Sequence, residues 1–133
     1  MREARCSCGG LRLTLSGVAP DVVACHCIEC QRRTGSPFGA IAYYPADAVT
    51  ISGVPKQYTR ATATGRKFHN YFCPECGTSV YFKADNHPTK LGVALGAIAD
   101  PNFPAPVRSV WEQSRHPWVE ITAAQHFPRG KEG

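Results

Sequence analysis

The stretch Cys25-His26-Cys27-Ile28-Glu29-Cys30 places three thiols within six residues, and Gln31-Arg32-Arg33-Thr34-Gly35-Ser36 follows it. The other four cysteines of the chain form two distant pairs, Cys6-Ser7-Cys8 and Cys73-Pro74-Glu75-Cys76. Spacings of this kind let neighbouring sulfurs from one short loop converge on a single metal ion. We therefore interpret the two pairs as one closed four-sulfur site and the trio as a second, open site.

The N-terminal residues and the cysteine count lead to an expected compartment. The N-terminal residues, Met1 to Cys6, contain no apolar stretch that would serve as an export signal. No segment approaches the ~18 apolar residues that cross a bilayer. We therefore expect a cytoplasmic protein without a membrane partner, in which thiols stay reduced. Because seven cysteines leave one thiol over in any complete disulfide scheme, a disulfide framework is the less favoured alternative.

The positive charge of the chain is a weak argument for a polyanionic partner. The formal net charge of +5 counts every cysteine as a neutral thiol. Because zinc with four thiolates carries −2 and zinc with three carries −1, the loaded chain would carry only about +2. The basic residues are also scattered, and the longest adjacent sets are Arg32-Arg33 and Arg66-Lys67. We therefore do not expect nucleic acid as a partner.

Glycine and proline dominate the local structure of this chain of 133 residues, which we interpret as a single domain over 1–133. Twelve glycines and eleven prolines favour turns and short strands over long helices. Ile28 to Thr34 suits about two turns of helix that end at Gly35. Strands are expected over 11–16, 38–44, 49–51, 56–60, 67–72, 79–83, 90–99 and 118–121, and a disordered end from about 127.

The two cysteine pairs are the natural ligands of one structural zinc. Zinc takes sulfur ligands at ~2.3 Å in a tetrahedron, and structural sites are closed by four of them. Cys73 and Cys76, with Gly77 just behind, match a zinc knuckle at the tip of a predicted hairpin. Cys6 and Cys8 supply the other half. Such a site contributes roughly 10–16 kcal/mol, against a net stability of about 5–15 kcal/mol, so its loss should unfold the domain.

The trio differs because it lacks a fourth cysteine. His26 is the nearest further ligand, but it lies between Cys25 and Cys27, and its ring would have difficulty reaching the same ion. Three protein ligands leave a position for water or substrate, which is the arrangement of catalytic zinc. Cys27 and Cys30 also lie at the start of the predicted helix, where the amide dipoles favour thiolate. The alternative is a second structural zinc that is closed by an unidentified residue or partner.

The charge of such a site indicates its chemistry. Zinc with three thiolates carries −1 and is a weak source of hydroxide, whereas sulfur suits it as a fourth ligand. We therefore expect a substrate thiol, held as thiolate, that attacks a small aldehyde or leaves in the reverse carbon–sulfur cleavage. Arg32 and Arg33 could bind the carboxylates of a peptide-like thiol, and Ser36 or Thr34 could donate a hydrogen bond to a developing alkoxide.

Each of these polar residues also has a simpler interpretation. The arginines can be solvated surface residues, and the hydroxyls can cap the helix or close a turn. The remaining lone histidines show no ligand spacing, and we expect no catalytic role for them: His69, His87, His116 and His126.

The cysteine blocks together resemble the family of glutathione-dependent formaldehyde-activating enzymes, also called the centromere protein V/Gfa domain family. The resemblance extends in order over about the first hundred residues. The matching pattern is Cys6-x-Cys8-Gly9, then Cys25-His26-Cys27-x-x-Cys30-x-Arg32-x-x-Gly35-x-x-Phe38, then Phe72-Cys73-x-x-Cys76-Gly77-x-x-Val80.

The resemblance implies a mainly β, Mss4-like fold of several small curved antiparallel sheets with a short helix. It implies two Zn²⁺ per chain, a structural ion on Cys6, Cys8, Cys73 and Cys76 and a catalytic ion on Cys25, Cys27 and Cys30. The activity of the family is condensation of glutathione with formaldehyde to S-(hydroxymethyl)glutathione. We therefore expect a zinc-dependent carbon–sulfur lyase that acts on a small thiol adduct. The alternative is a non-catalytic zinc-binding module that carries glutathione or zinc, or mediates interactions.

Overall fold

The computed structural model describes residues 2–131. Its backbone contacts separate two compact units. Unit 1 comprises the residues up to 20 and 43–100, and unit 2 comprises 21–42 and the residues from 101 onward. The assignment of one domain to the whole chain stays a prediction, and each unit is described by itself. Among the described residues, no helix is long and apolar enough to span a membrane.

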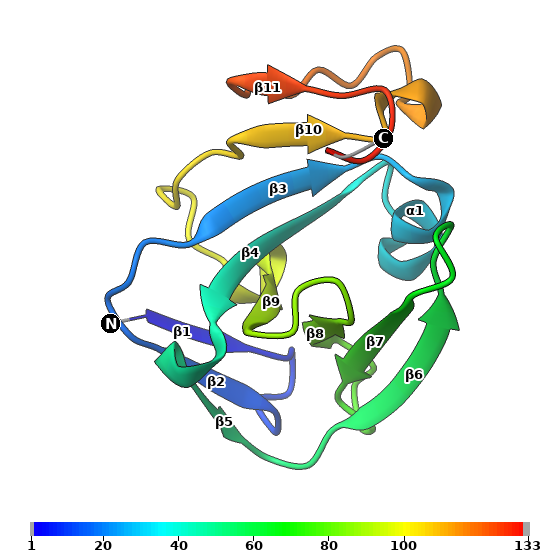
Figure 1. The fold of residues 1–133 in the computed structure, drawn as a ribbon. Helices are drawn as coiled ribbons and strands as arrows, with labels where there is room; N and C mark the ends of the chain where they lie inside the picture. Colours follow the sequence, from blue (N-terminus) through cyan, green and yellow to red (C-terminus); the bar gives the residue numbers. More distant parts are fainter. Residues whose placement is uncertain (1, 132–133) are drawn as a thin grey trace. The chain divides into compact units, whose positions relative to one another are not determined.

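The first sheet of unit 1 has three antiparallel strands in the order β1-β2-β5 (Figure 1). Its elements are β1 (Arg2–Arg5), β2 (Arg12–Leu15) and β5 (Val49–Ser52), with the 3₁₀ turn η1 (Ala46–Ala48) before β5. The alternation predicted for β2 is present: Leu13 and Leu15 are fully buried, whereas Arg12 and Thr14 are exposed. One face of this sheet therefore supplies part of the core of unit 1.

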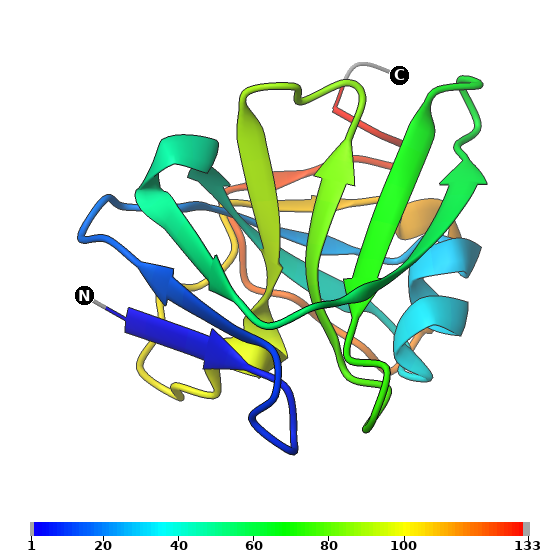
Figure 2. The same cartoon turned by 90° about the horizontal axis from the view of Figure 1, so that it is seen from below.

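Four further strands of unit 1 lie side by side and antiparallel, as Figure 2 shows in green. They are β6 (Lys56–Ala61), β7 (Lys67–Phe72), β8 (Ser79–Ala84) and β9 (Lys90–Ala94). The predicted hairpin of β7 and β8 is present, and the turn between them carries Cys73 and Cys76. The strand predicted over 90–99 is shorter, because the helix α2 (Leu95–Ile98) follows β9 and packs against β1 and β9.

Unit 2 contains neighbouring strands in the order β11-β10-β3-β4. Its elements are β3 (Asp21–Cys25), α1 (Ile28–Thr34), the start of β4 (Gly39–Pro45), β10 (Arg108–Val110), the 3₁₀ turn η2 (Glu112–Ser114) and β11 (Gln125–His126). β10 pairs in parallel with both β3 and β11, whereas the resemblance implied antiparallel sheets. The expected mainly β fold of small sheets with a short helix is confirmed.

The C-terminal part departs most from expectation. The prediction of a strand over 118–121 is wrong. This segment contains no strand and begins in a turn, in which the Val119 N–H donates to the His116 carbonyl. Residues from 127, expected to be disordered, instead bond to β10 and η2. The Phe127 N–H donates to the Ser109 carbonyl, and the Trp111 N–H donates to the Arg129 carbonyl, each at 2.9 Å. Residues 132 and 133 of that expected end lie outside the described residues.

A close approach of two backbone segments joins the ends of β2 and β5. Gly53, just after β5, has φ +101°, and a Cβ atom there would lie 2.2 Å from the carbonyl oxygen of Gly10. A side chain at this position would therefore force the two segments apart. The loop that Gly53 contacts continues directly to Cys8, so this contact also helps to place a cysteine.

We expect Gly53→Ala to destabilise the protein by at least about 1 kcal/mol more than Gly65→Ala, measured by urea unfolding. Both glycines have positive φ, +101° and +84°, so both variants carry the strain of the left-handed conformation. Only at Gly53 would the added Cβ meet backbone, since no described atom lies within 4 Å of a Cβ at Gly65. Equal losses in the two variants would contradict the steric explanation.

Candidate metal centres and a pocket on α1

Four cysteines of unit 1 converge from two turns. Cys6 and Cys8 lie between β1 and β2, and Cys73 and Cys76 lie in the turn between β7 and β8. The Sγ atoms of Cys6 and Cys8 are 3.7 Å apart, those of Cys8 and Cys73 are 3.6 Å apart, and all four lie within 4.8 Å of one another. A tetrahedron with ~2.3 Å bonds has edges of about 3.8 Å. These sulfurs are therefore spaced as the ligands of one ion, and we call them the foursome.

Glycines close both turns of the foursome. Gly9 and Gly77 have φ values of +80° and +78°, a conformation that costs glycine little. The Gly9 N–H donates to the Cys6 carbonyl at 3.1 Å, and the Gly77 N–H donates to the Cys73 carbonyl at 2.9 Å. Each turn thus presents two sulfurs on the same side of a tight loop.

Polar groups around the foursome act on its thiols in different directions. Thr78 Oγ1 lies 3.3 Å from Cys76 Sγ, and this hydrogen bond, followed by the backbone N–H groups of Cys8 and Thr78, lowers the pKa of Cys76 to about 5. The Gly10 N–H lowers the pKa of Cys8, but the three neighbouring sulfurs outweigh it and raise that pKa to about 11. The four thiols therefore do not share negative charge equally without a cation.

The three cysteines of unit 2, which we call the trio, gather around the start of α1. Cys25 ends β3, Cys27 caps the helix, and Cys30 lies in its first turn. Their Sγ atoms lie within 4.8 Å of one another. The backbone N–H of Cys30 donates to Cys27 Sγ at 3.3 Å, so the cap itself holds two members of the trio together. The helix ends at Thr34, with Gly35 at φ +65°, as the sequence predicted.

Crowding among the trio disfavours negative charge. The hydrogen bonds of Cys25 with Cys27 and Cys30, together with burial, raise the pKa of the Cys25 thiol. The hydrogen bond with Cys25 lowers the pKa of Cys30, but Cys27 and burial outweigh it, and the net direction is upward. A divalent cation would allow the thiols to ionise together by displacing their protons. Sulfur donors suit a thiophilic ion such as zinc, so both the foursome and the trio can hold metal.

His26 does not complete the trio. Its side chain is fully buried, and its Nε2 lies 2.9 Å from the Ser109 hydroxyl. Burial lowers the pKa of this imidazole. Among residues 2–131, no histidine, aspartate or glutamate joins the three sulfurs.

The two arginines after the trio have different surroundings. The Nε and Nη2 atoms of Arg33 are buried. A Cβ atom on Gly39 would lie 2.6 Å from Arg33 Nη2 and 3.4 Å from Cys30 Cβ, so the missing side chain leaves space for the guanidinium next to Cys30. Arg32 is 72% exposed and forms an ion pair with Glu29 at 2.9 Å.

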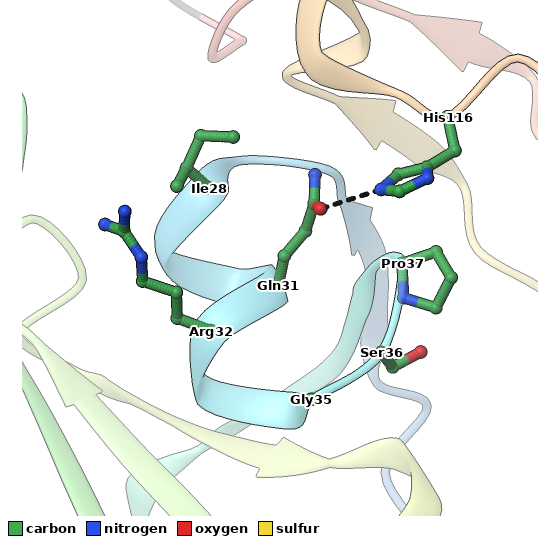
Figure 3. A pocket seen from close by; sticks show the side chains of 7 residues that line it. All are labelled: Ile28, Gln31, Arg32, Gly35, Ser36, Pro37 and His116. Carbon is green, nitrogen blue, oxygen red and sulfur yellow. Dashed lines mark hydrogen bonds between the residues drawn. The ribbon is translucent and has the colours of Figure 1, made fainter.

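A pocket of about 490 Å³ lies on the outward side of α1 (Figure 3). Its lining residues are Ile28, Gln31, Arg32, Gly35, Ser36, Pro37 and His116. Four of them recur at the spacing of one face of a helix: Ile28, Gln31, Arg32 and Gly35. Figure 3 shows Gln31 directed toward His116 and Arg32 extending away from it.

The hydroxyls of this region divide between the pocket and the turn. Ser36 lines the pocket. Thr34 Oγ1 donates to the Cys30 carbonyl at 2.8 Å and accepts from the Ser36 N–H at 3.1 Å. Thr34 thus has the turn role that was its simpler interpretation.

Gln31 connects the trio to the pocket. Its Nε2 donates to the carbonyl oxygens of His26 at 3.0 Å and Ser114 at 3.1 Å, and its Oε1 lies 2.9 Å from His116 Nε2. This network was not predicted from the sequence. A signal existed for Gln31, because it lies one helical turn after Cys27. None existed for Ser114 or His116, which are more than eighty residues away along the chain.

Comparisons with known proteins point to one family. A protein of Penicillium rubens is 27% identical over 125 residues, which cover 86% of this chain and 65% of its own length. A protein of Fusarium vanettenii is also 27% identical over 125 residues, which cover 86% of this chain and 66% of its own length. Both are named "Putative glutathione-dependent formaldehyde-activating enzyme". An uncharacterised lyase of Schizosaccharomyces pombe is 29% identical over 84 residues, 63% of this chain and 58% of its own length. The chain thus spans less than two thirds of each of these relatives.

A solved structure supports the fold. The crystal structure of a Rhodobacter sphaeroides protein matches with a TM-score of 0.58 and 23% identity, over 75% of this chain and 90% of that one. The family model described as glutathione-dependent formaldehyde-activating enzyme matches residues 1–114. With the foursome and the trio both assembled within that range, the chain belongs to the family of glutathione-dependent formaldehyde-activating enzymes.

Proposed function

We propose that this chain is a zinc-dependent enzyme of the carbon–sulfur lyase type that joins a small thiol to formaldehyde, or separates them. The observation that carries this proposal is the unequal ligand count: the foursome has four sulfurs for one ion, whereas the trio has three and no fourth ligand among the described residues. Four protein ligands are typical of structural zinc, and three are typical of catalytic zinc. We therefore assign one structural Zn²⁺ to the foursome and one catalytic Zn²⁺ to the trio.

The chemistry at the trio follows from its donors. When bound there, zinc supplies a position at which a substrate thiol is favoured as thiolate. Arg33 places a positive charge beside Cys30 and so offsets part of the negative charge that the sulfurs carry. The buried position of Cys30 excludes water from one side of the trio.

The pocket beside the trio supports a substrate larger than the reacting thiol alone. Its volume of about 490 Å³ is within the range of small-molecule sites, about 300–1,000 Å³. Arg32 at its wall can bind a carboxylate of a peptide-like thiol, and the Ser36 hydroxyl can donate a hydrogen bond to a carboxylate or an amide carbonyl of the same molecule. The names of the fungal relatives refer to glutathione, and we propose glutathione as this thiol. The cytoplasm, where thiols stay reduced, is the compartment we propose for it.

Metal content tests the two-site assignment. We expect about two zinc ions per chain in the purified protein by elemental analysis, and about one in Cys27→Ser, with the far-UV circular dichroism spectrum unchanged. Cys73→Ser should instead unfold the protein, because a structural zinc contributes roughly as much free energy as the whole fold retains. A Cys27→Ser variant that keeps both ions would contradict the assignment of the trio.

Turnover tests the reaction. Glutathione and ¹³C-formaldehyde interconvert spontaneously with their S-hydroxymethyl adduct. We expect the wild-type protein to accelerate this exchange above the spontaneous rate, as measured by NMR magnetisation transfer. Cys27→Ser should lose the acceleration and remain folded. If calorimetry instead shows that the wild-type protein binds glutathione through the trio without any acceleration, a non-catalytic carrier of glutathione becomes the better description.

A further inference from the structure

We propose that His116 is the general acid–base of this site, with its Nδ1 atom as the proton-transfer atom and Gln31 as the residue that fixes its tautomer. The inference rests on the proposed function and adds to it the group that moves the proton. It is carried by the hydrogen bonds of Gln31 and by the position of His116 in the wall of the pocket.

The orientation of the Gln31 amide is determined by its partners. Its Nε2 group has two hydrogens, and two carbonyl oxygens accept them, those of His26 at 3.0 Å and Ser114 at 3.1 Å. The opposite orientation would place the Gln31 oxygen against both carbonyl oxygens and would lose both bonds. Oε1 is therefore the atom that faces His116, and it can only accept.

This orientation sets the tautomer of His116. Because Oε1 only accepts, the Nε2 atom of His116, 2.9 Å away, must carry a hydrogen and donate it. In the neutral imidazole the lone pair is then on Nδ1. A base whose second nitrogen is oriented by a fixed acceptor is the arrangement that recurs in catalytic histidines.

The Nδ1 atom of His116 is available to a ligand. It hydrogen bonds to none of the residues 2–131, and it is not among the buried polar atoms that lack a partner. His26 is the contrast within the same unit, because its partnerless Nδ1 is buried. His116 lines the pocket with Ser36 and Pro37, and its ring meets Trp118 edge-on at 5.7 Å between ring centroids.

The pocket adjoins the trio along α1. Gln31 lies one helical turn after Cys27, and Ile28, at the pocket wall, follows Cys27 directly. Gln31 also donates a hydrogen bond to the carbonyl of His26, the residue between Cys25 and Cys27 in the sequence. We place the reacting thiol at the trio and the rest of its molecule in the pocket, whose wall includes the His116 ring.

The proton balance of the reaction assigns His116 both of its roles. In the forward direction the substrate S–H bond breaks, and its proton goes to Nδ1. The sulfur lone pair forms the S–C bond to formaldehyde as the C=O π bond breaks, and the oxygen takes the proton from Nδ1. The product is the S-hydroxymethyl adduct, and the reverse sequence cleaves it. No oxidant or further reactant is needed.

Three proteins test this inference in the ¹³C-formaldehyde and glutathione exchange assay: the wild type, His116→Gln and His116→Ala. Glutamine retains an amide N–H that can donate to Gln31 Oε1, but it has no basic nitrogen. We expect kcat to fall by about 100-fold or more in both variants, with little change in the KM for glutathione. Added imidazole should restore turnover in His116→Ala. His87→Gln, at an exposed histidine of unit 1, is the matched control and should keep wild-type turnover.

The outcomes separate the inference from the proposed function. Wild-type turnover in His116→Gln would overturn the role of His116 and leave the proposed function intact. Loss of turnover without imidazole rescue, together with loss of zinc or of folded structure, would show a structural role and also overturn it. A wild-type protein that does not accelerate the exchange would overturn both.

The role of Gln31 has a readout that does not depend on activity. Long-range ¹H–¹⁵N NMR should show the proton of neutral His116 on Nε2 in the wild type. Gln31→Met should lose this preference and lower kcat, because the side chain has similar length but no fixed acceptor. An Nδ1-protonated imidazole in the wild type would contradict the inference directly.

Discussion

Negative charges gathered in a small volume require a counter-charge, and this constraint governs both cysteine clusters. Each cluster brings its sulfurs within 4.8 Å of one another. Without a cation, the neighbouring sulfurs raise the pKa values of Cys8 and Cys25, so protons take the place of the missing charge. In unit 1 the constraint also reaches across the chain, because Cys8 and Cys73 are 65 residues apart. A cation that offsets part of the negative charge of the foursome therefore closes a long loop and favours the folded arrangement of unit 1.

The same type of ligand has different surroundings in the two clusters, and the difference matches the two roles proposed for them. The foursome is held by two glycine turns and by Thr78, whose hydroxyl lies 3.3 Å from Cys76 Sγ. The trio is held by the end of β3 and the cap of α1, with the charge of Arg33 beside Cys30. The structure around the foursome fixes its geometry, whereas the structure around the trio also places a positive charge and a pocket next to the sulfurs' helix.

The features that could be predicted from the sequence are those whose determinants are local. The cysteine spacings, the helix that ends at Gly35 and the hairpin around Cys73 each depend on a few consecutive residues. β10 and β11 could not be predicted, because β10 pairs with β3, more than eighty residues earlier, and β11 pairs in turn with β10. α2 was missed because Leu91, Val93 and Leu95 continue one alternation, and only packing against β1 and β9 distinguishes its turn from a strand. His116 was dismissed as a lone histidine because its partner, Gln31, is distant in sequence.

Gln31 shows why a substitution outside the cysteines can matter as much as one within them. An amide both donates and accepts, so a single side chain can hold the His26 carbonyl next to the trio and orient His116 in the pocket. A carboxylate at this position could only accept and would repel the two carbonyl oxygens. If the trio is the reactive centre, the choice of thiol depends on the outward face of α1 and on the segment that carries His116, because the sulfurs themselves distinguish no thiol from another.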